Sequence, residues 1–331
     1  MNASVIGGGS WGSAFARYLG CHKVPTRLWV REEEIYRDLI RRRENRTFLP
    51  GFRFPANVVF SRNIGEVVLP ADVLFIAVPS QYCRAVYTRV APLLEDRQVV
   101  VSLTKGLEQR SLRRMSQVMD EVFRPHARPR LAVLSGPSFA RDVAAEHPTA
   151  LVVASRDPGT ATAVQRLISS LTIRAYTSDD VTGVEIAGAL KNVIAIAAGI
   201  VDAMDFGLNS RAALITRGLV EITALGLSLG AVKKTFSGLA GIGDLVLTCT
   251  GELSRNHFVG YELGKGRSLE SILSHMKMVA EGVHTTISAR RLSRAQKVEM
   301  PITNEIYHVL YRGKPARRAL QDLMSRALRE E

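Results

Sequence analysis

The segment that most constrains this chain is its first one, where a short apolar run leads into a glycine turn and then a helical stretch. Gly7, Gly9 and Gly12 follow the apolar run at G-x-G-x-x-G spacing. In a dinucleotide-binding unit such glycines allow a tight turn, close approach of a pyrophosphate and close packing of helix on strand. The following helix directs its free N–H groups and positive dipole at the phosphates. The alternative is a tight turn with a purely structural role, and the surrounding pattern decides between the two.

That pattern is alternating α and β. Six further apolar runs predict strands at 26–30, 58–61, 72–78, 98–104, 131–134 and 150–154. Helical segments lie between them, such as 31–43, 111–123 and 160–171. The runs at 72–78 and 98–104 are nearly continuous, which is typical of parallel strands buried on both faces. We therefore expect a doubly wound parallel sheet whose ligand lies beyond the carboxyl ends of its strands. Four residues fall at such ends: Arg31, Pro79, Lys105 and Gly136.

After about residue 180 the pattern becomes helical, with no convincing strand. Helices are predicted at 184–201, 210–229, 269–276, 283–295 and 304–310. A chain of 331 residues is long for one core. We predict an α/β domain over residues 1–183 and an all-helical domain over 184–331.

Composition indicates an ordinary globular protein with an excess of positive charge. The net charge is +13 and is spread evenly, which suits small anionic ligands such as phosphates. Nucleic-acid binding is the less favoured alternative, since residues 41–43 are better interpreted as a solvated helix face. The three cysteines are far apart, which fits a reducing cytoplasm rather than a disulfide framework. No secretory signal is evident, and the longest apolar run, 193–201, is too short to span a bilayer, so we expect a cytoplasmic protein without membrane insertion.

One lysine stands in the most apolar helix. Lys191 is surrounded by apolar residues, so we expect it to be buried. Burial lowers the pKa of a lysine toward neutrality, which suits proton transfer. The alternative is an ammonium that reaches back to water. Asp244 closes a glycine-rich apolar loop, where it could orient a lysine or simply cap the next helix.

A second polar group follows another glycine-bearing loop. Ser254, Arg255 and Asn256 could hold a phosphate through a bidentate guanidinium with hydroxyl and amide neighbours, although the same tripeptide suits any polar turn. Lys105 lies at a strand's carboxyl end, before a glycine. No metal-binding spacing and no G-x-S-x-G elbow is present, so neither a metal site nor a hydrolase is expected. The combination favours redox chemistry on a phosphorylated carbonyl compound.

These residues lie in longer blocks that resemble one enzyme family along the whole chain. The blocks are 7–12, 48–51, 77–80, 105–107, 134–140, 189–193, 209–218, 238–250, 254–256 and 280–283. Together they resemble the bacterial NAD(P)-dependent glycerol-3-phosphate dehydrogenases. The resemblance implies interconversion of dihydroxyacetone phosphate and NAD(P)H with sn-glycerol 3-phosphate and NAD(P)+, supplying glycerophospholipid biosynthesis. It also implies a Rossmann domain, an all-α domain like that of 6-phosphogluconate dehydrogenase, and a homodimer.

The resemblance also implies roles for individual residues. Lys191 matches the family's catalytic acid/base, and Asp244 is assigned to the catalytic pair with it. The implied substrate contacts are Lys105, Gly136, Ser138, Lys191, Asp244, Ser254, Arg255 and Asn256. The implied cofactor contacts are Gly7, Gly9, Ser10, Trp11, Gly12, Arg31, Lys105, Ala140, Arg255, Val279 and Glu281.

Cofactor preference follows from the residue after the second predicted strand. NAD sites usually have an acidic residue there and NADP sites a basic one. Arg31 occupies this position, so we expect NADPH/NADP+ to be preferred over NADH/NAD+, with the acidic residues 32–34 able to weaken the preference.

Two competing interpretations remain open at this point. A related β-hydroxyacid dehydrogenase would act on a carboxylate substrate, which the 254–256 block disfavours. A nucleotide-sensing binding protein would need no catalytic group, and it leaves Lys191 and Asp244 in their apolar settings unexplained. Assays with a panel of substrates would distinguish the first alternative from an enzyme acting on a phosphorylated substrate. Turnover of any substrate would exclude the second.

Overall fold

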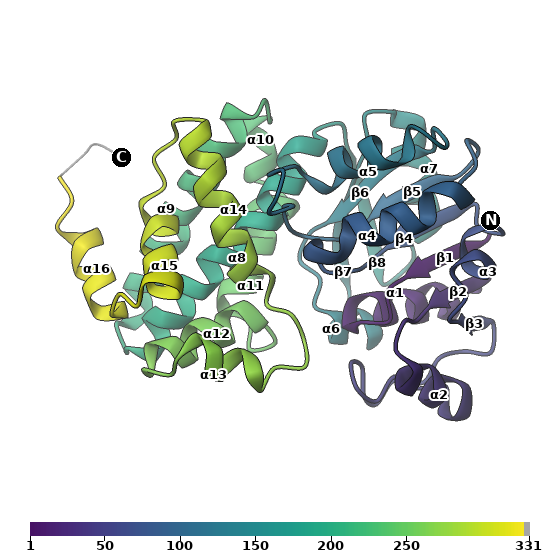
Figure 1. The fold of residues 1–331 in the computed structure, drawn as a ribbon, viewed down its shortest axis with the longest axis horizontal. Coiled ribbons are helices and arrows are strands. Elements are labelled where there is room, and N and C mark those ends of the chain that lie inside the picture. Colours follow the sequence, from purple (N-terminus) through teal and green to yellow (C-terminus); the bar gives the residue numbers. More distant parts are fainter. Residues whose placement is uncertain (328–331) are drawn as a thin grey trace. The chain divides into compact units, whose positions relative to one another are not determined.

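The structure, a computed structural model, describes residues 1–327 and divides them into two compact units. The first unit holds residues 1–105 and 113–185, and the second holds 106–112 and 186 onward. Figure 1 shows the first as a sheet flanked by helices and the second as a group of helices. Each unit has its own apolar core.

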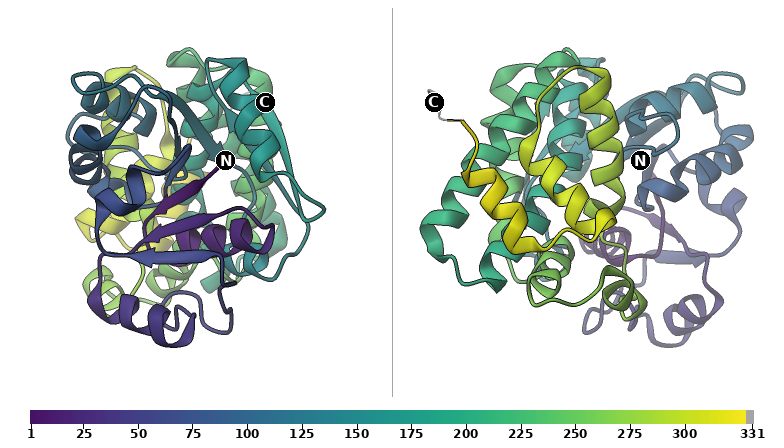
Figure 2. Two further views of the ribbon diagram at one scale, coloured as in Figure 1. Left: turned by 90° about the vertical axis from the view of Figure 1, so that its right-hand side faces the viewer. Right: turned by 60° about the vertical axis from the view of Figure 1, so that its left-hand side comes forward.

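The first unit is built on one eight-stranded sheet in the order β3-β2-β1-β4-β5-β6-β7-β8. Its strands are β1 (Ala3–Ile6), β2 (Thr26–Trp29), β3 (Val58–Ser61), β4 (Val73–Ile76), β5 (Val99–Ser102), β6 (Arg130–Ser135), β7 (Thr149–Ala154) and β8 (Ile173–Ser178). The strands from β3 to β6 run parallel, as predicted. The chain moves outward from β1 to β3 and returns to β4 on the other side of β1, so the strand order reverses between β1 and β4 (Figure 2). In a doubly wound sheet this reversal is where a ligand binds, beyond the carboxyl ends of the strands.

Alternate residues of each central strand pack into separate cores on the two faces of the sheet. Val5 and Phe75 contribute to one core, and Ile6 and Leu74 contribute to the other. This explains why the strands read as continuous apolar runs, since neither face meets water. The first face is covered by α1 (Ser10–Cys21), α2 (Glu33–Arg42), α6 (Ala140–Ala144) and α7 (Pro158–Ile168). The second is covered by α3 (Ile64–Val68), α4 (Ser80–Val90), a short 3-10 turn (Ala91–Leu93) and α5 (Met115–Phe123).

The far side of the sheet departs from the sequence prediction. Strand β7 pairs antiparallel to β6, and β8 then pairs parallel to β7. We did not predict β8, because it lies at the sheet edge and alternates buried and exposed residues instead of forming an apolar run. Arg174 and Tyr176 occupy its exposed positions, where the Arg174 guanidinium lies over the Tyr176 ring. The alternation is that of a strand with one wet face.

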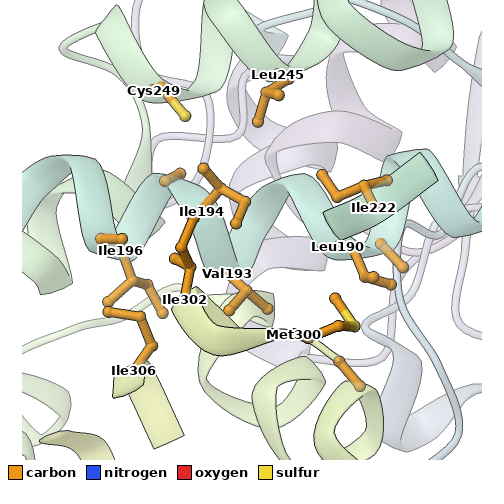
Figure 3. Packing of buried hydrophobic residues seen from close by; sticks show 14 of the residues in the cluster. Leu190, Val193, Ile194, Ile196, Ile222, Leu245, Cys249, Met300, Ile302 and Ile306 are labelled. Atoms are coloured by element: carbon orange, nitrogen blue, oxygen red, sulfur yellow. The ribbon is translucent and has the colours of Figure 1, made fainter. Parts of the chain in front are cut away.

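The second unit is helical in its described residues. Its elements are α8 (Val181–Ala203, whose first turn lies in the first unit), α9 (Gly207–Ser228), α10 (Lys233–Phe236), a wide helical turn (Leu239–Gly243), α11 (Asp244–Thr250), α12 (Arg255–Gly264), α13 (Leu269–Ser274), α14 (Glu281–Ala295), α15 (Pro301–Arg312) and α16 (Ala316–Met324). Figure 3 shows α8 at the centre of this unit, with Ile194 and Ile196 facing side chains of α11 and α15.

Helix α8 is longer than the apolar run 193–201 that we took from the sequence. With 23 residues the helix is long and apolar enough, by length and composition, to cross a membrane. Our expectation that the longest apolar segment is too short to do so was therefore wrong. Its most apolar stretch is buried inside the protein, as in the core helix of a globular domain. The helices packed around it explain why residues on every side of α8 are apolar.

Residues 106–112 belong with the helical unit, although they lie within the stretch we predicted as part of the sheet domain. Leu107 is in the helical core, and Arg291 Nη1 donates a hydrogen bond of 2.8 Å to the carbonyl of Gln109. The amide of Gln109 also lies 3.2 Å from His284 Nδ1. The helix predicted at 111–123 therefore begins only at Met115, after the chain has returned to the first unit.

Candidate functional site

The glycine turn after β1 has the geometry that the spacing predicts. Gly7 has a φ of +123°, and a Cβ there would lie 2.6 Å from the Ala77 carbonyl oxygen, which follows β4. A Cβ on Gly12 would overlap the Gly7 carbonyl oxygen, so α1 packs directly on the turn. A Cβ on Gly9 would meet nothing within 4 Å. Two glycines are thus required by the protein itself, while the third leaves an open backbone surface that a phosphate can approach.

The start of α1 adds an anion-binding element at this turn. Gly9 is the N-cap, so no side chain caps the first turn of the helix. The first N–H groups of a helix and its positive dipole end favour a negatively charged group. The structure therefore fits a dinucleotide pyrophosphate at 7–12.

A buried asparagine holds the turn from behind. Asn45 Nδ2 donates to the Gly8 carbonyl at 2.7 Å and to Ser13 Oγ at 2.9 Å, and its Oδ1 accepts from Phe48 N–H at 3.0 Å. Asn45 is fully buried. We did not predict a role for Asn45 from the sequence, because a single asparagine between charged residues carries no periodic or spacing signal.

Other predicted cofactor residues lie around the same turn. Ser10 is the first residue of α1. Trp11 and Ala140 pack against one small cluster that includes Leu49 and Ala144. Leu49 belongs to the 48–51 block, so the structure brings three separate sequence blocks together beside the glycine turn.

Arg31 lies two residues after the end of β2, and its side chain contacts Glu32 and Tyr82 rather than the glycine turn. Its Nε donates to Glu32 Oε1 at 2.9 Å, and its guanidinium lies over the Tyr82 ring, 5.8 Å from the centroid. Arg31 and Glu32 are both solvent-accessible. The acidic neighbour that we expected to weaken NADPH preference is therefore paired with the arginine that would confer it.

Two further candidates meet at the carboxyl ends of β5 and β6. Lys105 Nζ donates to the Gly136 carbonyl at 2.8 Å and lies 3.4 Å from Ser138 Oγ. Ser138 Oγ itself donates to the Gly136 carbonyl at 2.9 Å. A cation and a hydroxyl are thus presented together at the ligand edge of the sheet, as an anionic substrate requires.

In the helical unit, Lys191 and Asp244 form a buried ion pair. Lys191 Nζ lies 2.6 Å from Asp244 Oδ1 and 2.6 Å from Thr248 Oγ1. The side chains of Lys191 and Asp244 are 8% and 1% exposed. The ammonium therefore does not reach back to water, which excludes the alternative considered for Lys191. Asp244 is the first residue of α11, but the N-cap is Gly243 and no side-chain hydrogen bond caps the helix. Of the two interpretations of Asp244, the structure therefore favours orientation of the lysine.

Thr248 is a member of this group that the sequence did not identify. It lies one turn after Asp244 on α11, and its Oγ1 donates to the Asp244 carbonyl at 2.6 Å. Because the Thr248 hydroxyl proton is used in that bond, the hydroxyl oxygen accepts a hydrogen bond from the Lys191 ammonium. The spacing of four residues on one helix could have revealed it, because such residues share a face.

The 254–256 block forms the start of α12. Ser254 is the N-cap and accepts from His257 N–H at 3.2 Å, and Arg255 is the first helical residue and is exposed. Although Arg255 is solvent-accessible, the many protein atoms around its guanidinium reduce its solvation and lower its pKa, and the Glu281 carboxylate opposes that shift. Asn256 is buried, donates to Asn192 Oδ1 at 2.8 Å and accepts from Gly282 N–H at 2.8 Å.

These bonds connect several predicted positions. Asn192 directly follows Lys191, and Gly282 directly follows Glu281, the first residue of α14. Val279 lies two residues earlier and is partly buried. The helical unit therefore groups Lys191, Asp244 and the 254–256 and 279–281 segments. Gly7–Gly12, Arg31, Lys105, Gly136, Ser138 and Ala140 lie in the sheet unit.

Two family profiles match the chain, one for each part. Residues 2–161 match the NAD-dependent glycerol-3-phosphate dehydrogenase N-terminus, and residues 180–321 match the C-terminus of the same family.

Individual relatives are similar over their whole lengths. A protein of Geobacter sulfurreducens named glycerol-3-phosphate dehydrogenase (NAD(P)+) is 51% identical, covering 99% of this chain and 98% of the relative. One of Syntrophotalea carbinolica with the same name is 48% identical, covering 100% and 99%. The crystal structure of glycerol-3-phosphate dehydrogenase from Coxiella burnetii superimposes with a TM-score of 0.94 at 34% identity, covering 98% and 99%.

Proposed function

The chain belongs to the NAD-dependent glycerol-3-phosphate dehydrogenase family, and we propose that it reduces dihydroxyacetone phosphate reversibly to sn-glycerol 3-phosphate with NADPH or NADH. The product supplies glycerophospholipid biosynthesis. The observation that supports this best is the buried Lys191–Asp244–Thr248 group. Packing of an apolar core does not require a lysine, yet Lys191 Nζ is held there 2.6 Å from two oxygens.

Reduction of a ketone requires a hydride at carbon and a proton at oxygen. The reduced nicotinamide supplies the hydride when it is bound. Lys191 Nζ donates the proton to the carbonyl oxygen and accepts it back in the reverse reaction. Asp244 and Thr248 fix the direction of the ammonium through two hydrogen bonds of 2.6 Å.

The substrate phosphate needs fixed cationic and hydrogen-bonding groups. We assign Arg255 as the bidentate partner, with Ser254 and Asn256 as its neighbours, because Arg255 is exposed at the start of a helix that Asn256 anchors. Lys105, Gly136 and Ser138 are assigned to the remaining polar groups of the substrate. Binding energy from the phosphate then helps to hold the carbonyl in position for reaction.

For the cofactor we assign the pyrophosphate to Gly7, Gly9, Ser10, Trp11 and Gly12, with contacts from Lys105, Ala140, Arg255, Val279 and Glu281. We infer that NADPH is preferred over NADH because Arg31 follows β2, where a 2′-phosphate is bound in NADP sites. In this assignment residues 1–183 form the main cofactor-binding domain and also supply Lys105, Gly136 and Ser138 to the substrate. Residues 184–331 carry the catalytic pair and the phosphate-binding block 254–256, and they add Arg255, Val279 and Glu281 to the cofactor contacts. We further propose a cytoplasmic homodimer, on the family resemblance.

The test is a substrate panel with purified protein, following oxidation of NADPH and NADH. Dihydroxyacetone phosphate should be reduced, and 2-oxo and 3-oxo carboxylic acids of similar size should not. Preferred reduction of a carboxylate substrate would instead establish the β-hydroxyacid dehydrogenase alternative. Tight cofactor binding without turnover of any substrate would favour a nucleotide sensor.

A further inference from the structure

A polar cluster next to the 254–256 block has no role in the chemistry assigned so far. Asp202, in the last turn of α8, pairs through one oxygen with two partners. His257 Nε2 lies 2.7 Å from Asp202 Oδ2, and Arg211 Nη1 lies 3.0 Å from the same atom. The side chains of His257 and Asp202 are 19% and 21% exposed, so solvent screens this pair less than a surface pair. The cluster joins the end of α8 to the starts of α9 and α12.

Helix α12 lies close against α8 through small residues. Three contacts between the helices are spaced four residues apart on each of them. The pairs are Asn192 with Asn256, Ile196 with Gly260, and Ile200 with Gly264. A Cβ on Gly260 would overlap the carbonyl of Ile196, so the two backbones are in contact there. A Cβ on Gly199 would also overlap the carbonyl oxygen of His257, so the first turn of α12 touches α8 through its backbone as well.

Glycine contacts bring two helices close, but they provide no side chain that locks one helix against sliding along the other. Polar bonds add to the backbone contact at Gly199 in fixing the position of the first turn of α12. Asn256 bonds to Asn192, and His257 bonds to Asp202, which is ten residues further along α8. Ten residues span about 15 Å of helix. The first turn of α12 is thus held from two directions along α8.

Arg255 is the first residue of that turn. We propose that His257 and Asp202 are positioning residues that fix Arg255 for the substrate phosphate, with Arg211 balancing the Asp202 charge. This inference rests on the proposed function, in which Arg255 binds the phosphate. Neither His257 nor Asp202 touches the substrate, so their effect passes through Arg255.

The test is a double-mutant cycle between Arg255→Ala and His257→Ala, measured with dihydroxyacetone phosphate and with dihydroxyacetone, which lacks the phosphate. His257→Ala should lower kcat/KM for the phosphorylated substrate roughly tenfold, the worth of one hydrogen bond to a charged group. The slow reduction of dihydroxyacetone should fall far less, because that substrate has no phosphate for Arg255 to bind. In the Arg255→Ala background the His257 change should have almost no further effect.

Two variants sharpen the result. His257→Gln keeps an N–H donor and should recover most of the lost kcat/KM. The control is His275→Ala, which changes an exposed histidine at the C-terminal end of α13 and should have no effect. If His257→Ala does not fold, the cycle is run with Asp202→Asn, which keeps the side-chain shape. A purely structural role would lower activity on both substrates together.

The outcomes separate the inference from the function on which it rests. If Arg255→Ala leaves the kinetics of dihydroxyacetone phosphate unchanged, the phosphate assignment itself is wrong. If Arg255→Ala is impaired but the His257 loss adds to it in full, or affects dihydroxyacetone equally, the positioning role is overturned.

Discussion

Replacing Lys191 by methionine tests catalysis and burial at the same residue. Methionine keeps an unbranched chain of similar length and removes the proton donor. We expect turnover to fall by roughly 10²–10⁴-fold, the usual contribution of a positioned acid or base. NADPH affinity should change little, because the predicted pyrophosphate site lies in the other unit.

The structure adds a cost in stability that the sequence alone did not suggest. Lys191 compensates the charge of Asp244, which is only 1% exposed. Removing one partner of a buried ion pair destabilises a protein by about 3–5 kcal/mol. We therefore expect Lys191→Met to unfold at a clearly lower urea concentration than the parent.

A second substitution separates the two effects. Adding Asp244→Asn to Lys191→Met removes the uncompensated charge while keeping the shape of the side chain. The double variant should recover most of the lost stability and none of the turnover. The assay combines urea unfolding with steady-state kinetics and NADPH titration on all three variants.

Two results would refute this reasoning. If folded Lys191→Met turns over near the parental rate, the proton comes from another group, and Lys105 is the next candidate. If Asp244→Asn does not restore stability to Lys191→Met, the ion pair does not compensate a buried charge in the way described.

Four other substitutions test further parts of the structure. Arg255→Ala should cost about 2–4 kcal/mol in kcat/KM through loss of a bidentate phosphate contact, and kinetics within about twofold of the parent would contradict the assignment. Arg31→Ala should weaken binding of NADPH more than binding of NADH. Glu32→Gln removes the charged partner 2.9 Å from Arg31 and should shift cofactor preference toward NADPH. Equal changes for both cofactors would argue against contact between Arg31 and the 2′-phosphate. Glu221 is a buried residue of α9 whose carboxylate accepts hydrogen bonds from the N–H groups of Ile302 and Thr303. Its burial outweighs these bonds and raises its pKa to about 7. Since the folded state holds that proton more tightly, the contribution of Glu221 to stability is greatest below about pH 4.5 and is lost as pH rises through about 7, by about 3 kcal/mol in total. Unfolding of the parent and Glu221→Gln from pH 5 to 8 should therefore diverge in favour of Gln, and parallel curves would show that Glu221 keeps an ordinary pKa.

Residues in regular patterns were predictable from the sequence. The glycine turn at 7–12 follows from spacing, and the central strands follow from apolar runs, because strands buried on both faces have no polar positions. Lys191 was conspicuous for the same reason, as an ionisable residue in an apolar helix. Each of these signals is local, so it survives in the sequence without knowledge of the tertiary structure.

The residues that were missed depend on contacts between distant segments. Strand β8 lies at an edge, where one wet face makes its pattern resemble that of a loop. Asn45 and Asp202 matter only because the fold brings Gly8 and His257 to them, 37 and 55 residues away. Residues 106–112 join the helical unit through Leu107 and Gln109, which no periodicity indicates.

The central claim is that this chain transfers a hydride to the carbonyl carbon of dihydroxyacetone phosphate while a proton reaches the oxygen. Reduction with NADPH carrying deuterium at the transferable C4 position tests it directly, with the product analysed by mass spectrometry and NMR. We expect sn-glycerol 3-phosphate with one deuterium at C2, formed in equal amount to NADP+. Oxidation of NADPH without deuterium at C2 of the product would contradict it.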